Sequence, residues 1–326
     1  MSGAETAIAV EIGGSALRIG IVDQSGNVLR SARTDSSGLR DQSSASKVLL
    51  DEIQSFLGGA SVRDHAGIGI AMAGLVDNEA RSMVLASNLG WRDFHMGDEI
   101  EAMTGMRVVV DKDTNMSAIG ELHAGAGLSA VASAEAGRGL DSFIYASLGT
   151  GVGGSVIRDR KLLRGIGNRG GEFGHVYAGG DLLCGCGRRG CLETIAGGAW
   201  ITRRARESVG SKMLDLAGGD AEKITPIVIV QAAEQGDPEA REILADAARA
   251  VGIALVNAVR MIYPEAVILG GSVGSVREFI FEPIRVFVEE VSVLPGTNLP
   301  PVRVHPAGLG DSAALIGAGL AVFEGS

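Results

Sequence analysis

All three cysteines of this chain, Cys184, Cys186 and Cys191, lie within one eight-residue window that follows His175. One histidine and three cysteines can fill the tetrahedral shell of a zinc ion. A disulfide would leave one cysteine unpaired, and a bridge between cysteines separated by a single residue is strained. The spacing therefore predicts a structural Zn²⁺ bound by these four side chains, in preference to a disulfide or a redox pair.

Two carboxylates flank this cluster, Glu172 before His175 and Glu193 after Cys191. A zinc ion with four protein ligands has no open position for a reactive water, so its expected role is to hold a loop. We expect that loop to place Glu172 and Glu193 beside a polar ligand. The alternative is that both are ordinary surface carboxylates.

Glycine-rich turns follow three short β-prone runs, and glycine makes up 49 of the 326 residues. Glycine permits positive φ and lets backbone N–H groups point at an anion, as in phosphate-binding loops. The first turn could equally be a plain hairpin turn, whereas the second has four glycines in six residues, more than a hairpin needs. The predicted phosphate contacts are Gly13, Gly14 and Ser15 in the first turn and Gly149, Thr150, Gly151 and Gly153 in the second.

The third turn, Gly270-Gly271-Ser272, follows the apolar run Ala266–Leu269 and could admit a flat adenine base. Taken singly, it is more typical of a plain strand-to-helix turn. Neither of the first two turns is a Walker loop, because neither has the GxxxxGK[ST] spacing.

The segment Asp111-Lys112-Asp113 ends a predicted strand and opens a predicted helix. In α/β proteins ligands bind outside the carboxyl ends of the strands, so a carboxylate here is placed for chemistry. Either aspartate could instead cap the helix through its first N–H groups. The sequence leaves these two interpretations open.

Composition excludes several classes of protein. The net charge is −10 and no long Lys/Arg run occurs, which argues against nucleic acid or an anionic membrane as the main partner. No apolar stretch reaches the ~18 residues that a membrane span needs. The start of the chain lacks a basic segment before its first apolar run, so we expect a cytoplasmic protein with reduced thiols.

Strands alternate with helices along the chain, which indicates an α/β class with strands buried on both faces. Two strand–glycine turn–strand units, at Thr6–Val22 and Ser142–Ile157, indicate a duplicated architecture. The other predicted strands are Gly67–Met72, Arg107–Val110 and Ala266–Leu269. The predicted helices are Ala45–Leu57, Thr114–Ala124, Pro238–Met261, Val276–Val291 and Asp311–Phe323, with Asp237 capping the third.

Taken in order, these segments resemble the ROK family of sugar kinases and sugar-responsive repressors. The closest part is Gly170–His175 followed by the cysteine window up to Glu193. The Gly149–Gly154 turn resembles the family's second phosphate motif, and Leu269–Ser272 its adenosine motif. The segments Ala73–Asp77 and Asn88–Trp91 resemble two loops on the sugar side, and Leu309–Ala318 resembles the closing helix.

The resemblance implies a two-lobed actin/hexokinase-like (ribonuclease H-like) fold with a nucleotide cleft between the lobes. The smaller lobe is expected to comprise residues 1–116 and 309–326, and the larger lobe residues 117–308 with the zinc loop. A homodimer or homotetramer is also implied. Carried over by position, the resemblance makes Asp113 the catalytic base and implies ATP and Mg²⁺ as cofactors. The implied sugar contacts are Gly74, Asn88, Lys112, Glu172, His175 and Glu193, and His175 would also bind zinc.

The chain departs from the family pattern at the first phosphate turn and beside the base. The family has Asp, Thr and Lys where this chain has Glu11, Ser15 and Ala16, so a cation is missing at position 16. Lys112 stands where the family has Asn. One hypothesis is that Lys112 restores the missing charge; the alternative is that it points to solvent or narrows substrate choice.

The resulting prediction is an ATP-dependent kinase that acts on an aldohexose or an N-acetylhexosamine, at the 6-hydroxyl. The alternative is a sugar-binding regulator of the same family without turnover. Family repressors carry a DNA-binding domain before the first phosphate turn, and only ten residues precede Glu11 here. This favours the enzyme.

Overall fold

The computed structural model describes residues 5–77, 82–86, 89–129, 139–207 and 212–324. The chain forms two compact units of mixed α/β structure. Unit 1 comprises Met1–Gly139, Arg160–Gly170 and Gly308–Ser326, and unit 2 comprises Leu140–Asp159 and Gly171–Ala307.

A five-stranded sheet forms the centre of unit 1, in the order β3-β2-β1-β4-β8. Strand β1 pairs antiparallel with β2 and parallel with β4, and β4 pairs parallel with β8. The strands are β1 (Thr6–Ile12), β2 (Ala16–Asp23), β3 (Val28–Asp35), β4 (Ile68–Met72) and β8 (Val108–Lys112).

The register of the parallel strands aligns their carboxyl ends. Ile12 pairs with Met72, and Met72 pairs with Lys112, so the last residues of β1, β4 and β8 form one row across the sheet. The segments that follow these three strands therefore leave from the same edge. Those segments begin at Gly13, Ala73 and Asp113.

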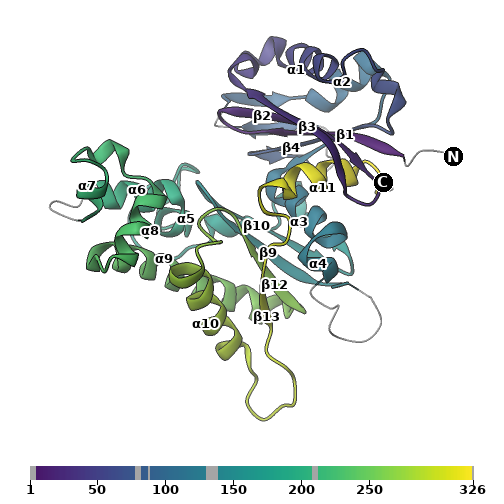
Figure 1. Ribbon diagram of the computed structural model, residues 1–326. Helices are drawn as coiled ribbons and strands as arrows, with labels where there is room; N and C mark the ends of the chain where they lie inside the picture. The colour runs from purple at the N-terminus through teal and green to yellow at the C-terminus, as the bar shows by residue number, and fades with distance from the viewer. Residues whose placement is uncertain (1–4, 78–81, 87–88, 130–138, 208–211, 325–326) are drawn as a thin grey trace. The chain divides into compact units, whose positions relative to one another are not determined.

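The two faces of this sheet differ because successive side chains alternate between them. Ile8, Val10 and Ile12 lie on one face, in a core shared with α1 (Gln42–Leu57) and α2 (Met96–Thr104). Ala9 and Ala71 lie on the other face, against α3 (Asp113–Ala124) and α11 (Ala313–Ala321). Figure 1 shows α1 and α2 on one side of the sheet and α11 on the other.

Glycines let α11 pack directly on the backbone of its neighbours. A Cβ at Gly69 in β4 would overlap the carbonyl of Ala318, and one at Gly317 would overlap the carbonyl of Met116 in α3. The buried Glu121 of α3 accepts hydrogen bonds from the N–H groups of Gly308 and Leu309, 3.0 and 2.9 Å away, where the chain returns to unit 1. Backbone contact and this carboxylate together fix α11.

Unit 2 repeats the plan of unit 1. Strand β9 pairs antiparallel with β10 and parallel with β12, which pairs parallel with β13. The order β10-β9-β12-β13 thus matches β2-β1-β4-β8 in sequence and direction, which confirms the predicted duplication. The strands are β9 (Phe143–Leu148), β10 (Val152–Arg158), β12 (Ala266–Gly270) and β13 (Arg303–Pro306).

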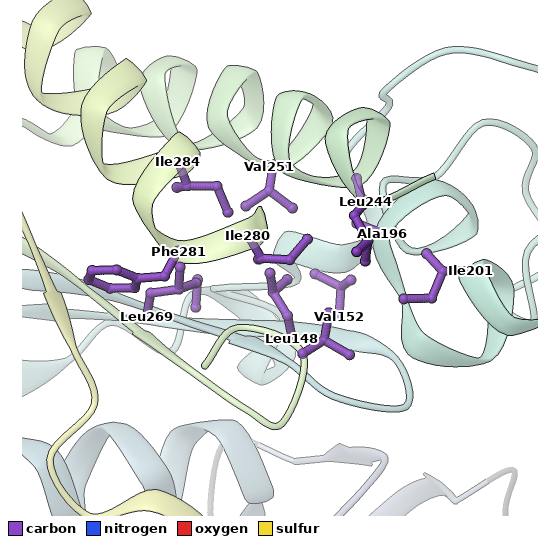
Figure 2. Packing of buried hydrophobic residues seen from close by; sticks show 14 of the residues in the cluster. Leu148, Val152, Ala196, Ile201, Leu244, Val251, Leu269, Ile280, Phe281 and Ile284 are labelled. Atoms are coloured by element: carbon purple, nitrogen blue, oxygen red, sulfur yellow. The ribbon is translucent and has the colours of Figure 1, made fainter. Parts of the chain in front are cut away.

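The core of unit 2 lies between this sheet and a layer of helices, as Figure 2 shows for Leu148 and Leu269 on the strands and Val251 and Ile284 above them. The longest helix is α9 (Pro238–Ile262), and the side chain of Asp237 caps it as predicted, accepting from the N–H groups of Glu239 and Ala240. The other helices are α5 (Glu193–Ala196), α6 (Gly198–Arg206), α7 (Lys212–Leu216), α8 (Pro226–Glu234) and α10 (Glu282–Ser292).

Two predicted boundaries differ from the structure. The helix predicted at Val276–Val291 begins with a π-helical turn, Arg277–Phe281, and continues as α10 from Glu282. Pro283 has no N–H to donate at the start of α10, which breaks a regular helix there. A lobe boundary at residue 116 would cut α3, whereas α3 lies wholly in unit 1 because α11 packs along it.

The remaining elements of unit 1 are short. A three-stranded sheet, β5 (Leu75–Val76), β6 (Met83–Ala86) and β7 (Trp91–Phe94), adds the buried Trp91, whose indole N–H donates to the carbonyl of Leu39 at 3.0 Å. Two further short elements are α4 (Ala126–Ser129) and β11 (Lys161–Leu162). Within the described ranges, no helix has the length and apolar character to cross a membrane.

The packing of α11 generates a stability prediction. Gly69→Ala should lower the free energy of unfolding by about 3 kcal/mol, since a methyl group there must displace the backbone of α11. Chemical denaturation measures this loss. Gly38→Ala is the matched control, because its added Cβ would make only an ordinary contact with Val48, 3.5 Å away. Equal stability of the two variants would contradict the packing described.

Candidate functional site

The first glycine turn is a tight connection between β1 and β2. The N–H of Gly13 donates to the carbonyl of Ala16 at 2.8 Å, which leaves Gly14 and Ser15 exposed at the tip. Neither Gly13 nor Gly14 has a positive φ, so the conformational freedom expected of these glycines is not what the turn uses. The exposed backbone and the Ser15 hydroxyl remain the groups that could meet a phosphate.

A cation that the sequence motifs did not indicate stands beside this turn. Arg18 pairs with Glu11 across β1 and β2, and its Nη1 donates to Glu11 Oε2 at 3.0 Å and to the carbonyl of Asp311. Residues 16 and 18 share a face of β2, so Arg18 supplies positive charge on the face where Ala16 has none. The period of two along the strand could have revealed it.

Glu11 is a partly buried carboxyl at this edge of the sheet. Burial raises its pKa above the ordinary value; Arg18 opposes the rise, while the negative charges of Asp113 and Asp311 add to it. The guanidinium of Arg18 therefore favours the ionised form of Glu11.

Asp113 is the first residue of α3 and lies at the carboxyl edge of the sheet. Its Oδ1 accepts the N–H of Thr114 at 2.7 Å, which orients the carboxylate at the start of the helix. Asp111 is fully buried, and its Oδ1 accepts the N–H of Lys112 at 2.7 Å. The two aspartates that the sequence could not separate thus have different environments, one partly exposed and one internal.

Lys112 is only 4% exposed, so the alternative that it points to solvent is wrong. Its Nζ donates to the carbonyl of Gly170 at 2.9 Å. That hydrogen bond attaches residues 160–170 to the end of β8. The ammonium is therefore held at the junction of β8 and α3 instead of extending into water.

Gly74 follows β4 at the same edge. Its φ is +148°, and a Cβ there would overlap the carbonyl of Leu85, so only glycine fits this bend. Asn88, the other sugar-side residue predicted nearby, lies outside the described residues.

In unit 2 the Gly149–Gly154 turn joins β9 to β10. Thr150 is exposed, and the carbonyls of Gly149 and Thr150 accept the N–H groups of Gly198 and Ala199 at the start of α6. Gly151 lies against the carboxylate of Glu193, which a Cβ would strike. As in the first turn, the glycine does not have a positive φ. It is needed here because the side chain of Glu193 approaches its backbone too closely for a Cβ.

Glu193 links this turn to the cysteine window. Its Oε2 accepts the N–H of Val152 at 3.0 Å, and its Oε1 lies 3.6 Å from the sulfur of Cys184. One carboxylate thus contacts the predicted phosphate turn and the predicted metal cluster.

The four predicted zinc ligands converge. Ligand atoms of His175, Cys184, Cys186 and Cys191 all lie within 4.8 Å of one another. The Sγ of Cys184 is 3.7 Å from Nδ1 of His175, and the sulfurs of Cys186 and Cys191 are 3.6 Å apart. Bonds of about 2.3 Å at tetrahedral angles separate two sulfurs by about 3.8 Å, so the donor set fits zinc.

The pKa values of the three thiols are shifted in different directions. Burial raises the pKa of Cys184 to about 12, and burial also raises that of Cys191. Burial acts in the same direction on Cys186, but hydrogen bonds from the N–H of Arg188 and from the neighbouring thiols lower its pKa overall. A metal ion must displace protons from Cys184 and Cys191, so its binding releases protons.

Glu172 lies beside the same histidine. Its Oε2 is 4.0 Å from Nε2 of His175, and both side chains are about one third exposed, at 33% and 34%. Since Nδ1 faces Cys184, the opposite ring nitrogen faces Glu172. The histidine therefore spans the cysteine cluster and a partly exposed carboxylate.

The third glycine turn borders a cavity within unit 2. Gly271 has a φ of +84° and packs on the backbone of Leu148, while Ser272 is exposed. A cavity of about 550 Å³ lies beside it, lined by Ser272 and Val276 and by Ile227, Val230 and Gln231 of α8. Apolar walls with a few polar groups suit a flat heterocycle.

The predicted site residues therefore fall into two sets. Unit 1 brings Gly13, Gly14, Ser15, Gly74, Lys112 and Asp113 to one edge of its sheet. Unit 2 brings Gly149, Thr150, Gly151, Gly153, Glu193 and the cysteine cluster together, and Glu172 lies beside His175 of that cluster. Gly270, Gly271 and Ser272 lie at the end of the neighbouring strand β12.

Comparison with known proteins gives one consistent family. The model of the ROK family matches residues 7–324. The glucokinase of Streptomyces coelicolor is 33% identical over 320 residues, 95% of each chain, and the N-acetylmannosamine kinase of Salmonella arizonae is 27% identical over 314 residues, covering 95% of this chain and 98% of the relative. The crystal structure of a ROK family glucokinase from Streptomyces griseus with glucose and AMPPNP superposes with a TM-score of 0.80, at 31% identity, covering 98% of this chain and 100% of that one.

The cysteine cluster generates a metal prediction. The purified protein should contain about one zinc ion per chain, and Cys186→Ser should lose most of it, because the remaining three ligands bind more weakly. Zinc content by mass spectrometry and the melting temperature measure both effects. Arg188→Gln, an exposed change in the same loop, should retain the metal. A Cys186→Ser protein with full zinc content would show that the four side chains do not act as one shell.

The Glu11–Arg18 pair generates a pH prediction. A carboxyl whose pKa is raised by folding stabilises the fold at low pH, and this contribution is lost as the pH rises through the folded-state pKa. Arg18→Gln raises the pKa of Glu11 further, so its stability deficit should grow from near zero at about pH 4 to roughly 1 kcal/mol at about pH 7. Urea denaturation at both pH values measures the deficit. Arg33→Gln, opposite Arg18 on β3 and exposed, should show no such growth.

Proposed function

This chain belongs to the ROK family, and from that premise we propose that it is an ATP-dependent hexose kinase with Asp113 as its general base. The observation that carries the proposal is the position of Asp113. Its carboxylate follows β8, in line with the first glycine turn after β1 and with Gly74 after β4. This is the edge at which α/β sheets bind their ligands.

Phosphoryl transfer depends mainly on positioning and charge neutralisation, which fits the groups present. Asp113 would accept the proton of the attacking sugar hydroxyl as the oxygen approaches the transferred phosphoryl group. The hydrogen bond from the N–H of Thr114 to Oδ1 would hold the carboxylate in a fixed orientation toward that hydroxyl. Mg²⁺ bound with the nucleotide would supply neutralising charge on the phosphates.

The nucleotide contacts are assigned to the three glycine turns. The backbone at Gly13, Gly14 and Ser15, and at Gly149 and Thr150, would hold phosphate oxygens; Gly14, Ser15 and Thr150 are the exposed residues among them. The adenine would enter the cavity beside Gly270, Gly271 and Ser272, between Val276 and Ile227. The complex of the Streptomyces griseus relative with AMPPNP supports ATP as the donor.

The proposed sugar contacts are Glu172, His175, Glu193, Gly74, Asn88 and Lys112. Of these, the carboxylates of Glu172 and Glu193 would accept hydroxyl protons, and the ammonium of Lys112 would donate. Carboxylates that hydrogen-bond hydroxyls reject analogues that lack them, because the acceptor is then left buried and unpaired. The glucokinase and N-acetylmannosamine kinase relatives support an aldohexose or an N-acetylhexosamine as the substrate. The 6-hydroxyl as the acceptor is part of our proposal.

Zinc would act on structure alone. His175, Cys184, Cys186 and Cys191 would hold it and leave no position for substrate. Its effect would be to fix the loop from which Glu193 and Glu172 project. Because Nδ1 of His175 faces the sulfurs, the ring stays oriented with Nε2 toward Glu172.

The test is an ADP-release assay across glucose, mannose, N-acetylglucosamine and N-acetylmannosamine. At least one sugar should turn over, and Asp113→Asn should lower kcat by a factor of at least about 10², since it keeps the shape and removes the base. Asp159→Asn, an 88% exposed aspartate, is the matched control and should retain full activity. Sugar binding by calorimetry with no turnover on any sugar would refute the kinase and indicate a sugar-binding regulator.

A further inference from the structure

Asp111 is a buried carboxylate to which the proposed mechanism gives no role. It lies two residues before Asp113, at the end of β8, and its side chain is fully buried. An isolated charge in that position would cost several kcal/mol, so its partners decide whether the junction of β8 and α3 is stable. Those partners come from a distant part of the chain.

Residues 164–170 supply them. Arg164 forms an ion pair with Asp111 Oδ2 through Nη1, and the side-chain amide of Asn168 donates to Asp111 Oδ1 at 2.9 Å. Lys112 donates in the opposite direction, from Nζ to the carbonyl of Gly170. This segment, which we call the strap, is thus attached to both residues that precede Asp113.

The same carboxylate is bonded to the beginning of α3. Asp111 Oδ1 accepts the backbone N–H of Lys112 at 2.7 Å and the side-chain amide of Asn115 at 2.8 Å. Asn115 lies in the first turn of the helix whose first residue is Asp113. Any movement of Asp111 is therefore transmitted to the residues on either side of Asp113.

The strap adopts a conformation that its sequence does not favour locally. Asn168 is completely buried with a φ of +54°, and Gly165 and Gly167 also have positive φ. An asparagine in this region costs free energy relative to glycine, which its side-chain hydrogen bonds to Asp111 and Asn115 offset. The polar contacts, not local preference, hold Asn168 in place.

We propose that Arg164 and Asn168 are positioning residues, which through Asp111 hold the β8–α3 junction so that the Asp113 carboxylate is aimed for proton abstraction. The inference rests on the proposed function, and it adds residues that touch neither sugar nor nucleotide. A displacement of a catalytic group by about 1 Å can cost roughly 10²-fold in rate. Loss of the strap contacts should therefore lower kcat more than it weakens binding.

The experiment compares Arg164→Gln, Arg164→Lys and Asn168→Gly with the wild type in the full-length protein. Asn168→Gly is the mildest change, because glycine adopts the same φ without cost and only the side chain is lost. Arg169→Gln, an exposed arginine of the strap, is the matched control. Steady-state kinetics are combined with hydrogen exchange of the peptide amides at residues 108–117 and with melting temperatures.

The expected result is a fall in kcat of roughly 10- to 100-fold for Arg164→Gln and Asn168→Gly, with the KM values for sugar and ATP within about twofold of wild type. Exchange at Lys112 should rise, Arg164→Lys should recover part of kcat, and Arg169→Gln should match wild type. Wild-type kcat in folded Asn168→Gly and Arg164→Gln proteins would overturn the positioning role and leave the kinase intact. Absence of wild-type turnover would instead overturn the proposed function, and the positioning role with it.

Discussion

The parallel pairing of β1, β4 and β8 is the constraint on which the rest of unit 1 depends. It places Ile12, Met72 and Lys112 in one row, so three segments that are far apart in the chain leave from one edge of the sheet. The side chains on the face that carries Ala9 and Ala71 must be small, because α11 and α3 pack directly against it. Glu11 and Arg18 lie on that same face and form an ion pair near the end of β1.

The periodic features of the sequence predict the fold well. Apolar runs locate the strands, the two glycine turns indicate a duplicated plan, and Asp237 is a cap in both the sequence pattern and the structure. The convergence of His175 with the three cysteines agrees with the sequence pattern, because three cysteines and a histidine in one short loop are typical of a tetrahedral zinc site. These signals are local, so a single sequence is enough to identify them.

The features that the sequence did not reveal depend on contacts between distant residues. Nothing near Asp111 indicates that Arg164 and Asn168 lie against it, or that the ammonium of Lys112 is bonded to the carbonyl of Gly170. The glycine pattern predicts positive φ in the two turns proposed to bind phosphate, whereas Gly151 lacks a positive φ and is required because a Cβ there would overlap the carboxylate of Glu193. The spacing of residue types along the sequence indicates secondary structure, but it does not indicate which distant side chain packs against a given glycine.

The attachment of α11 also bears on how the protein is made. Strands β1 to β8 of unit 1 precede unit 2 in the sequence, whereas α11, which covers their small-residue face, follows unit 2. The carboxylate of Glu121 likewise accepts hydrogen bonds from Gly308 and Leu309, which also follow unit 2 in the sequence. Residues 171–307 of unit 2 form most of their core among themselves and can begin to pack earlier. Unit 1 can therefore be completed only after most of unit 2 has been synthesised, because α11 follows unit 2 in the sequence.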